Sequence, residues 1–355
     1  MFFRILQIFV FLLVLISCVA TVEAPKKLEK KIQTEEINFN FTGITKLNLK
    51  DSDIIFNREY VYALPDYRDY QEFNNYFQIG VYSAIKHFEI QNKIEFISQD
   101  DLNLKNLGEN FLIGPISKKI VEQIDGQLNI NQALFLNPAE DNHYISLSDK
   151  PQINVLLKYL DANDADRIGV VYSSTKNETE GKFKKLWFDK DRDMITINAS
   201  VDSNVRIENF LDISDSKERY KLIDDASFAD VYFIPRSRDD FKQIIIFPEN
   251  NNILYRLSSL IRFNYGLDYE IIALTSDLKD TLDPNEIKLH KIKLIDHTYL
   301  NRYSYDLSKS RSYSLGFDSM MIAYILSNKI DGTFKGFLGT YELQNETLEM
   351  RSYFN

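Results

Sequence analysis

The stretch EYVYALPD, residues 59–66, indicates how the fold begins. Its apolar and aromatic run, closed by Pro65-Asp66, predicts a buried strand that ends in a turn. The residues that follow predict a helix with five apolar side chains on one face: Phe77, Val81, Ala84, Ile85 and Phe88. A strand followed by an amphipathic helix is the unit from which parallel sheets are built.

The same alternation continues along the chain. Further strands are expected in KIEFISQD (93–100), NFLIGPIS (110–117), QALFLNP (132–138), RIGVVYSS (167–174), DVYFIPRS (230–237) and DYEIIALTSD (268–277). A helix is expected in PQINVLLKYLDAN (151–163), with further helical stretches between the later strands. These units are too many and too widely spread for one small sheet. We therefore predict an α/β protein of two Rossmann-like lobes with parallel sheets.

The C-terminal segment has a different pattern. GFDSMMIAYILSN (316–328) predicts an amphipathic helix, and residues 337–354 predict a hairpin with its turn at Gln344-Asn345. Leu348, Met350 and Phe354 fall on alternate positions, which indicates one packed face.

Turn-forming or polar residues follow the predicted strands. In open α/β sheets, ligands bind in the crevice at the carboxyl ends of the strands. The candidate residues for a cleft between the lobes are Asp66, Gly114, Ser117, Asn137, Ser173, Ser276 and Asp277. The alternative interpretation is that each parallel strand simply needs a polar turn to leave the sheet.

The N-terminus predicts export. Arg4 is followed by an apolar run, Ile5 to Ile16, of about a dozen residues, which is shorter than the roughly 20 that a membrane-spanning helix needs. Cys18, the only cysteine, follows Leu15-Ile16-Ser17, as in a bacterial lipobox. We expect a lipoprotein signal peptide over 1–17 and a lipid on Cys18, although an ordinary signal peptide with a chance cysteine is the alternative. Residues 18–54 are expected to form a flexible tether.

Composition excludes several classes of function. The net charge of −10 argues against a nucleic-acid binder, which needs a basic face. No phosphate-binding glycine loop and no hydrolase motif is present, and the four histidines are too dispersed for a metal site. Ser-x-x-Lys occurs four times without the companion motifs of β-lactamases, so we assign it to chance. No catalytic residue, metal or cofactor is expected.

In its order of motifs the chain resembles the penicillin-binding protein activator family, the LppC/LpoA lipoproteins. The resemblance rests on YVYALPD, IGVYSAIKHF, FLIGPISKKIVEQI, QALFLNP, HYISLSDKPQ, ALTSD, LGFDSMMIAYIL and GFLGTYEL, which occur in the family's order between residues 60 and 354. Asp66 departs from the family's Leu-Pro-Leu, and Ser319 replaces its Ala. The best-known members also carry a large N-terminal helical-repeat domain, whose place is taken here by the tether.

The resemblance implies a type I periplasmic-binding-protein-like fold whose hinge the chain crosses several times. Lobe 1 would comprise residues 55–147 with 284–330, and lobe 2 residues 148–283 with 331–355. It also implies a non-catalytic lipoprotein of the outer membrane that faces the periplasm. Its partner would be a class A penicillin-binding protein, whose peptidoglycan synthesis it would stimulate, and peptidoglycan itself is a second candidate partner.

Fold alone does not decide function. The main alternative is a solute-binding receptor lipoprotein that captures an amino acid, a peptide or a cell-wall fragment between its lobes. An enzyme is a distant third reading, because the sequence offers no catalytic group with a convincing partner.

Overall fold

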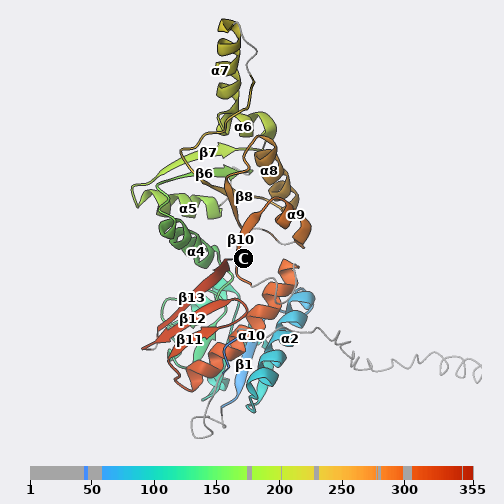
Figure 1. Ribbon diagram of the computed structural model, residues 1–355. Helices are drawn as coiled ribbons and strands as arrows, with labels where there is room; N and C mark the ends of the chain where they lie inside the picture. The colour runs from blue at the N-terminus through green and yellow to red at the C-terminus, as the bar shows by residue number, and fades with distance from the viewer. Residues whose placement is uncertain are drawn as a thin grey trace, which may run out of the picture. The chain divides into compact units, whose positions relative to one another are not determined.

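Strands and helices of the computed structural model alternate as the sequence predicts (Figure 1). The structure describes residues 44–46, 58–173, 178–200, 202–227, 232–276, 278, 281–298, 306–345 and 347–354. Cys18, the predicted signal peptide and nearly all of the predicted tether lie outside these residues.

The elements of the first half are β1 (Tyr60–Leu64), α2 (Gln71–Phe88), β2 (Ile94–Ser98), the 3₁₀ turns η2 (Gln99–Asp101) and η3 (Leu104–Asn106), β3 (Phe111–Ile113), α3 (Lys118–Ile124), β4 (Ala133–Phe135), β5 (His143–Tyr144), α4 (Asp149–Ala162), β6 (Arg167–Tyr172), α5 (Glu178–Phe188) and β7 (Asp193–Asn198). The second half adds α6 (Ser203–Phe210), α7 (Ile213–Ala226), β8 (Gln243–Phe247), α8 (Asn251–Phe263), β9 (Glu270–Leu274), α9 (Pro284–Leu289), β10 (Ile292–Asp296), α10 (Leu307–Ser327), β11 (Gly332–Lys335), β12 (Gly339–Gln344) and β13 (Thr347–Phe354).

The first sheet is fully parallel, with the strand order β2-β1-β3-β4-β5. Its strand β1 is the YVYAL of the opening stretch, and every residue of β1 is buried. Val61 and Ala63 pack toward Val121 of α3, on one face of the sheet. Tyr62 points to the other face, where its ring meets that of Phe77 in α2 at 5.7 Å. The period-2 alternation of β1 therefore buries both faces of the sheet.

Helices α2 and α10 lie side by side over this second face (Figure 1). Two glycines set their separation. A Cβ on Gly316 would stand 2.0 Å from the carbonyl oxygen of Phe77, and a Cβ on Gly80 would stand 2.0 Å from that of Tyr313. The two backbones are thus in direct contact, which only residues without a side chain permit.

Helix α10 is buried on almost every side, which corrects the prediction of an amphipathic helix for residues 316–328. The segment between β11 and β12 covers the side that would otherwise face water. Asp318 is fully buried and accepts hydrogen bonds from the backbone N–H groups of Phe337 and Leu338, both at 2.7 Å, and from the Tyr341 hydroxyl at 2.8 Å. A helix covered on all sides has no polar stripe to display.

The second sheet is mixed, with the order β11-β12-β13-β10-β9-β8-β6-β7. Strands β6 to β10 pair with one another in parallel. Strands β11, β12 and β13 form antiparallel pairs, and β13 also pairs antiparallel with β10. Ile244 and Ile246 of β8 pack against α6 and α8, whereas Ile245 and Phe247 pack against α4 and α5. A sheet with helices on both faces requires such continuously apolar strands.

The strand predicted in residues 230–237 is wrong for 232–237, which form no strand. Tyr232 and Ile234 are 88% and 64% exposed, and Phe233 stacks on Tyr220 of α7 at 4.4 Å. The sheet position is taken instead by β8, the run QIIIF, which is wholly buried. The aromatic content of 230–237 suggested a strand, but Pro235 and the neighbouring helix keep this segment out of the ladder.

The predicted lobes need one correction. Residues 284–296 were expected with the first lobe, yet β10 pairs in register with β9 of the second sheet, Ile292 opposite Ile271. The C-terminal hairpin contacts both parts of the protein. Its strand β13 pairs with β10 of the second sheet, and Tyr341 of β12 donates a hydrogen bond to Asp318 of α10, the helix that packs on the first sheet. The remaining lobe boundaries stay predictions.

The hairpin itself is present, with a turn one residue later than predicted. Gln344 still pairs with Thr347, so the first residue of the turn is Asn345. Asn345 has a φ of +50°, a value that asparagine tolerates better than most residues.

Candidate functional site

The predicted cleft residues of the first sheet fall into two groups. Asp66 forms a turn by itself, whereas Gly114, Ser117 and Asn137 lie in loops that are hydrogen-bonded to one another. Asp66 follows β1 and is exposed; its carboxylate accepts a hydrogen bond from the backbone N–H of Arg68 at 2.8 Å. This is a local turn of the kind that aspartate commonly forms. Asp66 has no described bond to another predicted cleft residue.

Gly114 and Ser117 lie in the connection that leaves β3. Gly114 has a φ of +97°, and a Cβ there would stand 2.4 Å from the carbonyl oxygen of Ala63, so glycine is required. The backbone N–H of Ser117 donates to the side chain of Gln99, which follows β2, at 3.2 Å.

Asn137, after β4, joins the same set. Its amide donates to the carbonyl of Ile116 at 2.8 Å. The loops after β2, β3 and β4 are thus fastened to one another by their own polar groups. These contacts agree with the reading of the residues as turns, because their hydrogen bonds are used within the protein.

Ser173 and Ser276 lie at the strand ends of the second sheet. The Ser173 hydroxyl accepts from the backbone N–H of Glu249 at 3.2 Å, which joins the ends of β6 and β8. The backbone N–H of Ser276 donates to Gln152 of α4 at 3.1 Å, and its hydroxyl donates to Thr179 at 3.4 Å. Asp277, the last predicted residue, lies outside the described residues.

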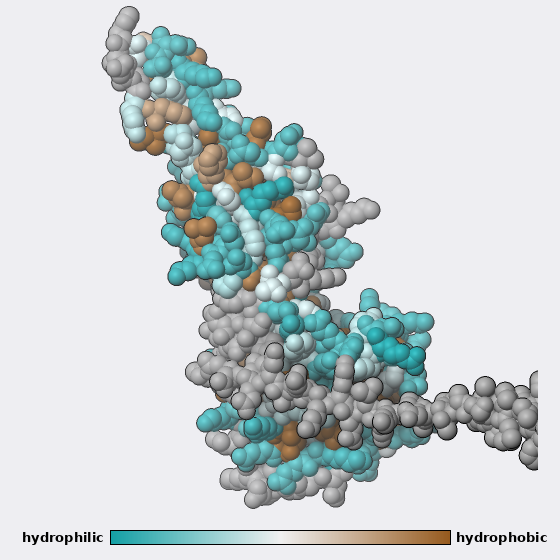
Figure 2. Space-filling model, turned by 90° about the vertical axis from the view of Figure 1, so that its right-hand side faces the viewer, coloured by the Kyte–Doolittle hydropathy of each residue, from teal (hydrophilic) through white to brown (hydrophobic). Residues whose placement is uncertain are grey.

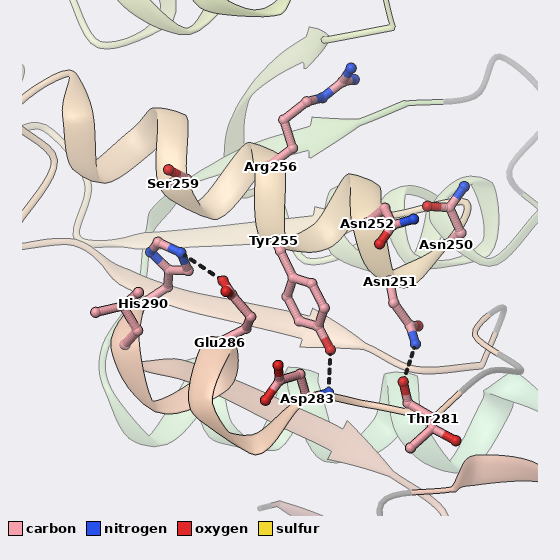
Figure 3. Close-up of a pocket in the computed structure, with 11 residues that line it drawn as sticks. Asn250, Asn251, Asn252, Tyr255, Arg256, Ser259, Thr281, Asp283, Glu286 and His290 are labelled. Carbon is pink, nitrogen blue, oxygen red and sulfur yellow. Dashed lines mark hydrogen bonds and ion pairs between the residues drawn. The ribbon is translucent and has the colours of Figure 1, made fainter.

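Two surface pockets occur elsewhere, and neither contains a predicted cleft residue. One, of about 1080 Å³, lies between α8 and α9 (Figure 3). The other, of about 470 Å³, is lined by Ser146, Ser148 and Lys150 on one side and by Arg351 of β13 on the other. The second pocket lies where β5 continues into α4, the position at which the sequence predicted a crossing between lobes.

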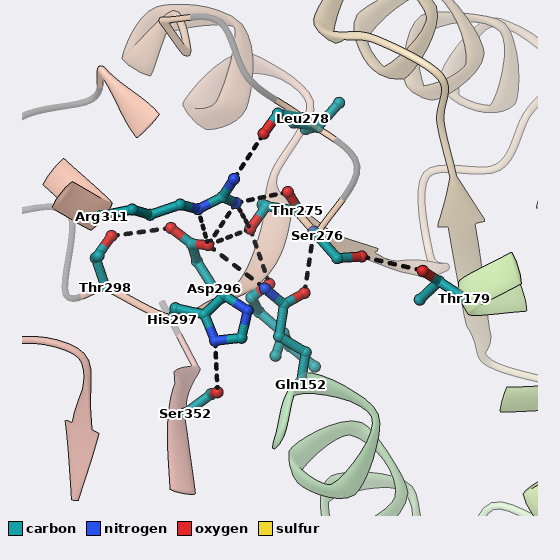
Figure 4. A network of polar contacts seen from close by, with 11 residues as sticks. Gln152, Thr179, Thr275, Ser276, Leu278, Asp296, His297, Thr298, Arg311 and Ser352 are labelled. Carbon is teal, nitrogen blue, oxygen red and sulfur yellow. Dashed lines mark hydrogen bonds and ion pairs between the residues drawn. The ribbon is translucent and has the colours of Figure 1, made fainter. Parts of the chain in front are cut away.

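A buried ionic cluster that sequence reasoning missed lies beside Ser276 (Figure 4). Asp296, at the end of β10, is completely buried, and the guanidinium of Arg311 in α10 contacts it at 2.8 Å. Arg311 also donates to the carbonyls of Leu278, at 2.7 Å, and Thr275, at 2.6 Å. The hydroxyl of Thr298 donates to the other carboxylate oxygen of Asp296 at 2.9 Å.

The cluster connects elements that belong to different sheets. Thr275 directly follows β9, and Asp296 is the last residue of β10, so both belong to the second sheet's strand ends. Arg311 belongs to α10, which packs on the first sheet through the contact between Tyr62 and Met320. Gln152 adds α4, because its amide reaches Asp296 at 3.5 Å. We name these four residues, Gln152, Thr275, Asp296 and Arg311, the ionic junction.

Charge in the junction is balanced within the protein. Burial alone raises the pKa of Asp296, but Arg311 and the Thr275 hydroxyl outweigh burial and hold that pKa at about 2. The neighbouring His297 is also buried, and burial lowers its pKa to about 4, so the ring is neutral at pH 7. Its Nδ1 lies 3.4 Å from the Ser352 hydroxyl of β13.

Little in the sequence pointed to the junction. Asp296 and His297 form an unremarkable polar end to a strand, and Arg311 precedes the apolar run from which the last helix was predicted. The available signal was the pair of cations, Lys309 and Arg311, in the polar first turns of a long helix. Within the described residues, no three His, Cys, Asp or Glu side chains gather to hold a metal ion, and no helix is both long and apolar enough to cross a membrane.

Apolar side chains on the surface form no continuous patch on the face seen in Figure 2. They stand as separate areas within a largely hydrophilic surface. The most exposed large apolar residues of the described chain include Leu222, Tyr232, Phe263, Leu267 and Leu289. Scattered exposed residues of this kind are normal for a globular protein.

No family model matches the sequence, and no curated protein matches it. Solved structures do. The C-domain of LpoA (YraM) from Haemophilus influenzae, described as a regulator of PBP1A, has a TM-score of 0.56 and 12% identity, and the match covers 83% of this chain and 95% of that domain. Full-length LpoA from the same organism has a TM-score of 0.54 and 12% identity, with 88% of this chain and 58% of that chain covered. This chain therefore spans little more than half the length of full-length LpoA.

A protein from Chromobacterium violaceum assigned to branched-chain amino acid ABC transport is equally similar. Its TM-score is 0.58 and its identity 15%, and the match covers 84% of this chain and 99% of that one. At such identities the likeness concerns the fold. The predicted fold class is confirmed: the chain has the α/β, periplasmic-binding-protein-like fold that the LpoA C-domain shares with solute-binding proteins.

Proposed function

We propose that this protein is a non-catalytic outer-membrane lipoprotein that binds a class A penicillin-binding protein and stimulates its peptidoglycan synthesis. Cys18 would carry the lipid, and the folded body would face the periplasm. The fold of the LpoA C-domain, a regulator of PBP1A in Haemophilus influenzae, supports this proposal over 83% of the chain. The identity of the partner is part of the proposal, because the likeness to the LpoA C-domain, at 12% identity, concerns the fold alone.

The observation that carries the proposal is that residues at the strand ends are already hydrogen-bonded to neighbouring parts of the protein. In a solute receptor, polar groups at these positions are available to a ligand. Here Gln99, Ser117 and Asn137 hold neighbouring loops together, and Ser276 holds Gln152. A solute that used the amide of Asn137 or the backbone N–H groups of Ser117 and Ser276 would have to break those hydrogen bonds and replace them. Groups already paired in this way favour a body that works through its outer surface.

A protein that contributes no catalytic group can activate an enzyme only by binding one conformation of that enzyme more tightly than another. The protein would bind the active conformation of the synthase more tightly than its resting conformation, and the ratio of the two affinities sets the stimulation. A tenfold stimulation needs a difference of about 1.4 kcal/mol, which a modest interface can supply.

The test uses residues 26–355, immobilised and presented to the class A penicillin-binding proteins of the same organism. We expect saturable binding, and we expect faster glycan synthesis and crosslinking when the protein is added to the enzyme. A solute-binding protein of the same fold is the matched control and should do neither. Absence of both binding and stimulation would contradict the proposal.

The alternative is a solute-binding receptor lipoprotein, which the likeness to the Chromobacterium violaceum protein favours. A ligand that binds only the native state raises the melting temperature. Thermal-shift screening with amino acids, peptides and cell-wall fragments would therefore separate the two functions. A clear shift with one such compound would support the receptor.

The lipid anchor has its own test. A Cys18→Ser variant lacks the thiol that takes the lipid, so we expect it to leave the outer-membrane fraction while its folded body is unchanged. Fractionation of this variant with the outer membrane, as for the natural protein, would argue against the anchor.

A further inference from the structure

Helix α7 and the segment that returns beside it extend away from the second sheet (Figure 1). The first turns of the helix are attached to the body, and Ser216 there accepts a hydrogen bond from the backbone N–H of Arg236 at 3.1 Å. Further out, the rings of Tyr220 and Phe233 stack at 4.4 Å and hold the returning segment against the helix. We name α7 together with residues 232–237 the arm.

The outer half of α7 is exposed all round, because every residue from 221 to 226 is exposed. Two of these residues are large and apolar: Leu222 is 70% exposed and Ile223 is 57% exposed. Tyr232 and Ile234 of the returning segment are exposed as well. Helices in proteins take most of their stability from packing an apolar face. The arm instead holds its apolar side chains in water, so it gains from burying them against another molecule.

Charge on the outer half of α7 is balanced. Residues 217–226 carry as many cations as carboxylates: Lys217, Arg219 and Lys221 against Glu218, Asp224 and Asp225. The chain as a whole has a net charge of −10. The arm therefore lacks the excess of negative charge that would repel an acidic partner, and its apolar side chains remain as the basis of a contact.

The N-terminal segment meets the body at β11. Ile44 is buried, and the backbone N–H of Thr45 donates to the carbonyl of Lys335 at 3.1 Å. The backbone N–H of Lys335 donates in turn to the Thr45 hydroxyl at 2.8 Å. Any anchor at Cys18 is therefore connected through residues 19–43 to a fixed point beside β11.

This point and the arm belong to opposite edges of the second sheet. Strands β11 and β7 are the two edge strands of that eight-stranded sheet, and α6 and α7 follow β7 in the chain. Neighbouring strands are about 4.8 Å apart, which puts the edges on the order of 30 Å from each other. The arm extends beyond the β7 edge (Figure 1).

We propose that the arm docks in an apolar groove of the class A penicillin-binding protein, with Leu222 and Ile223 as its anchors. The inference rests on the proposed function, from which it takes the lipid on Cys18 and the partner. A body held to the outer membrane at its β11 edge carries the arm on the edge remote from that membrane. An enzyme that builds peptidoglycan works away from the outer membrane, so it meets this edge. A helix that presents neighbouring apolar side chains is a common ligand of such a groove.

The test compares the affinity of the natural protein, residues 26–355, and of Leu222→Gln/Ile223→Gln for the immobilised penicillin-binding proteins of the same organism. Glutamine retains helix propensity and removes the apolar anchors. Both positions are exposed, so the variant should fold normally. We expect its affinity to be at least about tenfold weaker, because a few apolar anchors carry most of the energy of an interface.

Leu267→Gln/Leu289→Gln is the matched control. These two residues are 69% and 71% exposed and lie outside the arm, so this variant should bind like the natural protein. A second measurement needs no variant: hydrogen exchange of the amides of 221–226 should slow when the natural protein binds the enzyme.

The outcomes separate this inference from the proposed function. If the natural protein binds and the arm variant binds equally well, or if exchange at 221–226 stays as fast in the complex, the arm is not the docking surface and the proposed function stands. An equal loss of affinity in the control variant would also overturn the role of the arm. Absence of binding by the natural protein would contradict the proposed function and this inference with it.

Discussion

The guanidinium of Arg311 lies 2.8 Å from the fully buried carboxylate of Asp296 and links the helix over the first sheet to the strand ends of the second. The same guanidinium also donates to the carbonyls of Thr275 and Leu278. A buried ion pair of this kind adds little net stability over apolar packing, but breaking it is costly. Its consequence here is mechanical, because the position of α10 depends on groups of the second sheet.

Removal of one partner from the pair should be strongly destabilising. Arg311→Leu leaves Asp296 buried without its cation, and we expect the free energy of unfolding to fall by about 3–5 kcal/mol. The double variant Asp296→Leu/Arg311→Leu removes both charges and should be less destabilised than the sum of the two single variants. Urea denaturation measures all three. Strict additivity would mean that the two side chains do not act as a pair.

Stability should depend on pH through His297. Burial lowers the pKa of His297 to about 4 in the folded state, against 6.5 when unfolded. Above pH 6.5 both states are neutral and the stabilisation is complete. Between pH 6.5 and 4 the unfolded chain takes up a proton that the folded chain does not, so stability falls as pH falls. From pH 7.5 to 5 the loss should be roughly 2 kcal/mol for this one group.

Two variants isolate that effect. His297→Gln should remove most of the pH dependence in this window, whereas His290→Gln, at the half-buried end of α9, should retain it. Denaturation midpoints at pH 7.5, 6 and 5 provide the measurement. An equal slope in His297→Gln and the natural protein would show that other groups cause the effect.

The contact between α2 and α10 predicts a contrast between two glycines. Gly316→Ala would place a Cβ 2.0 Å from the backbone oxygen of Phe77, and backbone cannot yield as a side chain can. We expect a loss of about 1–3 kcal/mol or failure to fold. Gly181→Ala, on the exposed side of α5, meets nothing within 4 Å and should stabilise the protein by up to about 1 kcal/mol. Thermal denaturation of both variants tests the pair, and equal melting temperatures would argue against the close contact.

The fold was predictable where local pattern and packing agree. The run YVYAL of β1 and the apolar face of α2 are signals that any parallel unit needs, and both elements form as expected. The strand QIIIF of β8 was missed because a short apolar run carries no period, while the aromatic residues around Phe233 gave a false signal. Local pattern also could not show that the second sheet extends into the C-terminal hairpin, since this depends on pairs distant in sequence.

The candidate site was less predictable than the fold. Position at a strand end indicated Ser117, Asn137 and Ser276, but not that each would be hydrogen-bonded to a neighbouring loop or helix. The partnership of Asp296 with Arg311 depends on where α10 lies, and the sequence holds no local mark of it. Side chains that act across two elements are therefore found only once the elements are placed.

Asp318 predicts a further dependence of α10 on the C-terminal hairpin. The carboxylate is fully buried and accepts from two backbone N–H groups at 2.7 Å and from the Tyr341 hydroxyl at 2.8 Å. Asp318→Asn replaces one acceptor oxygen by an NH₂ group that faces a donor, so we expect a loss of about 2–3 kcal/mol. Tyr341→Phe removes only one hydrogen bond and should cost about 1–2 kcal/mol. Because the hydrogen bonds hold residues 336–338 against α10, hydrogen exchange of the Phe337 and Leu338 amides should accelerate more in Asp318→Asn than in Tyr341→Phe. Equal protection of these amides in the two variants would contradict the role given to the carboxylate.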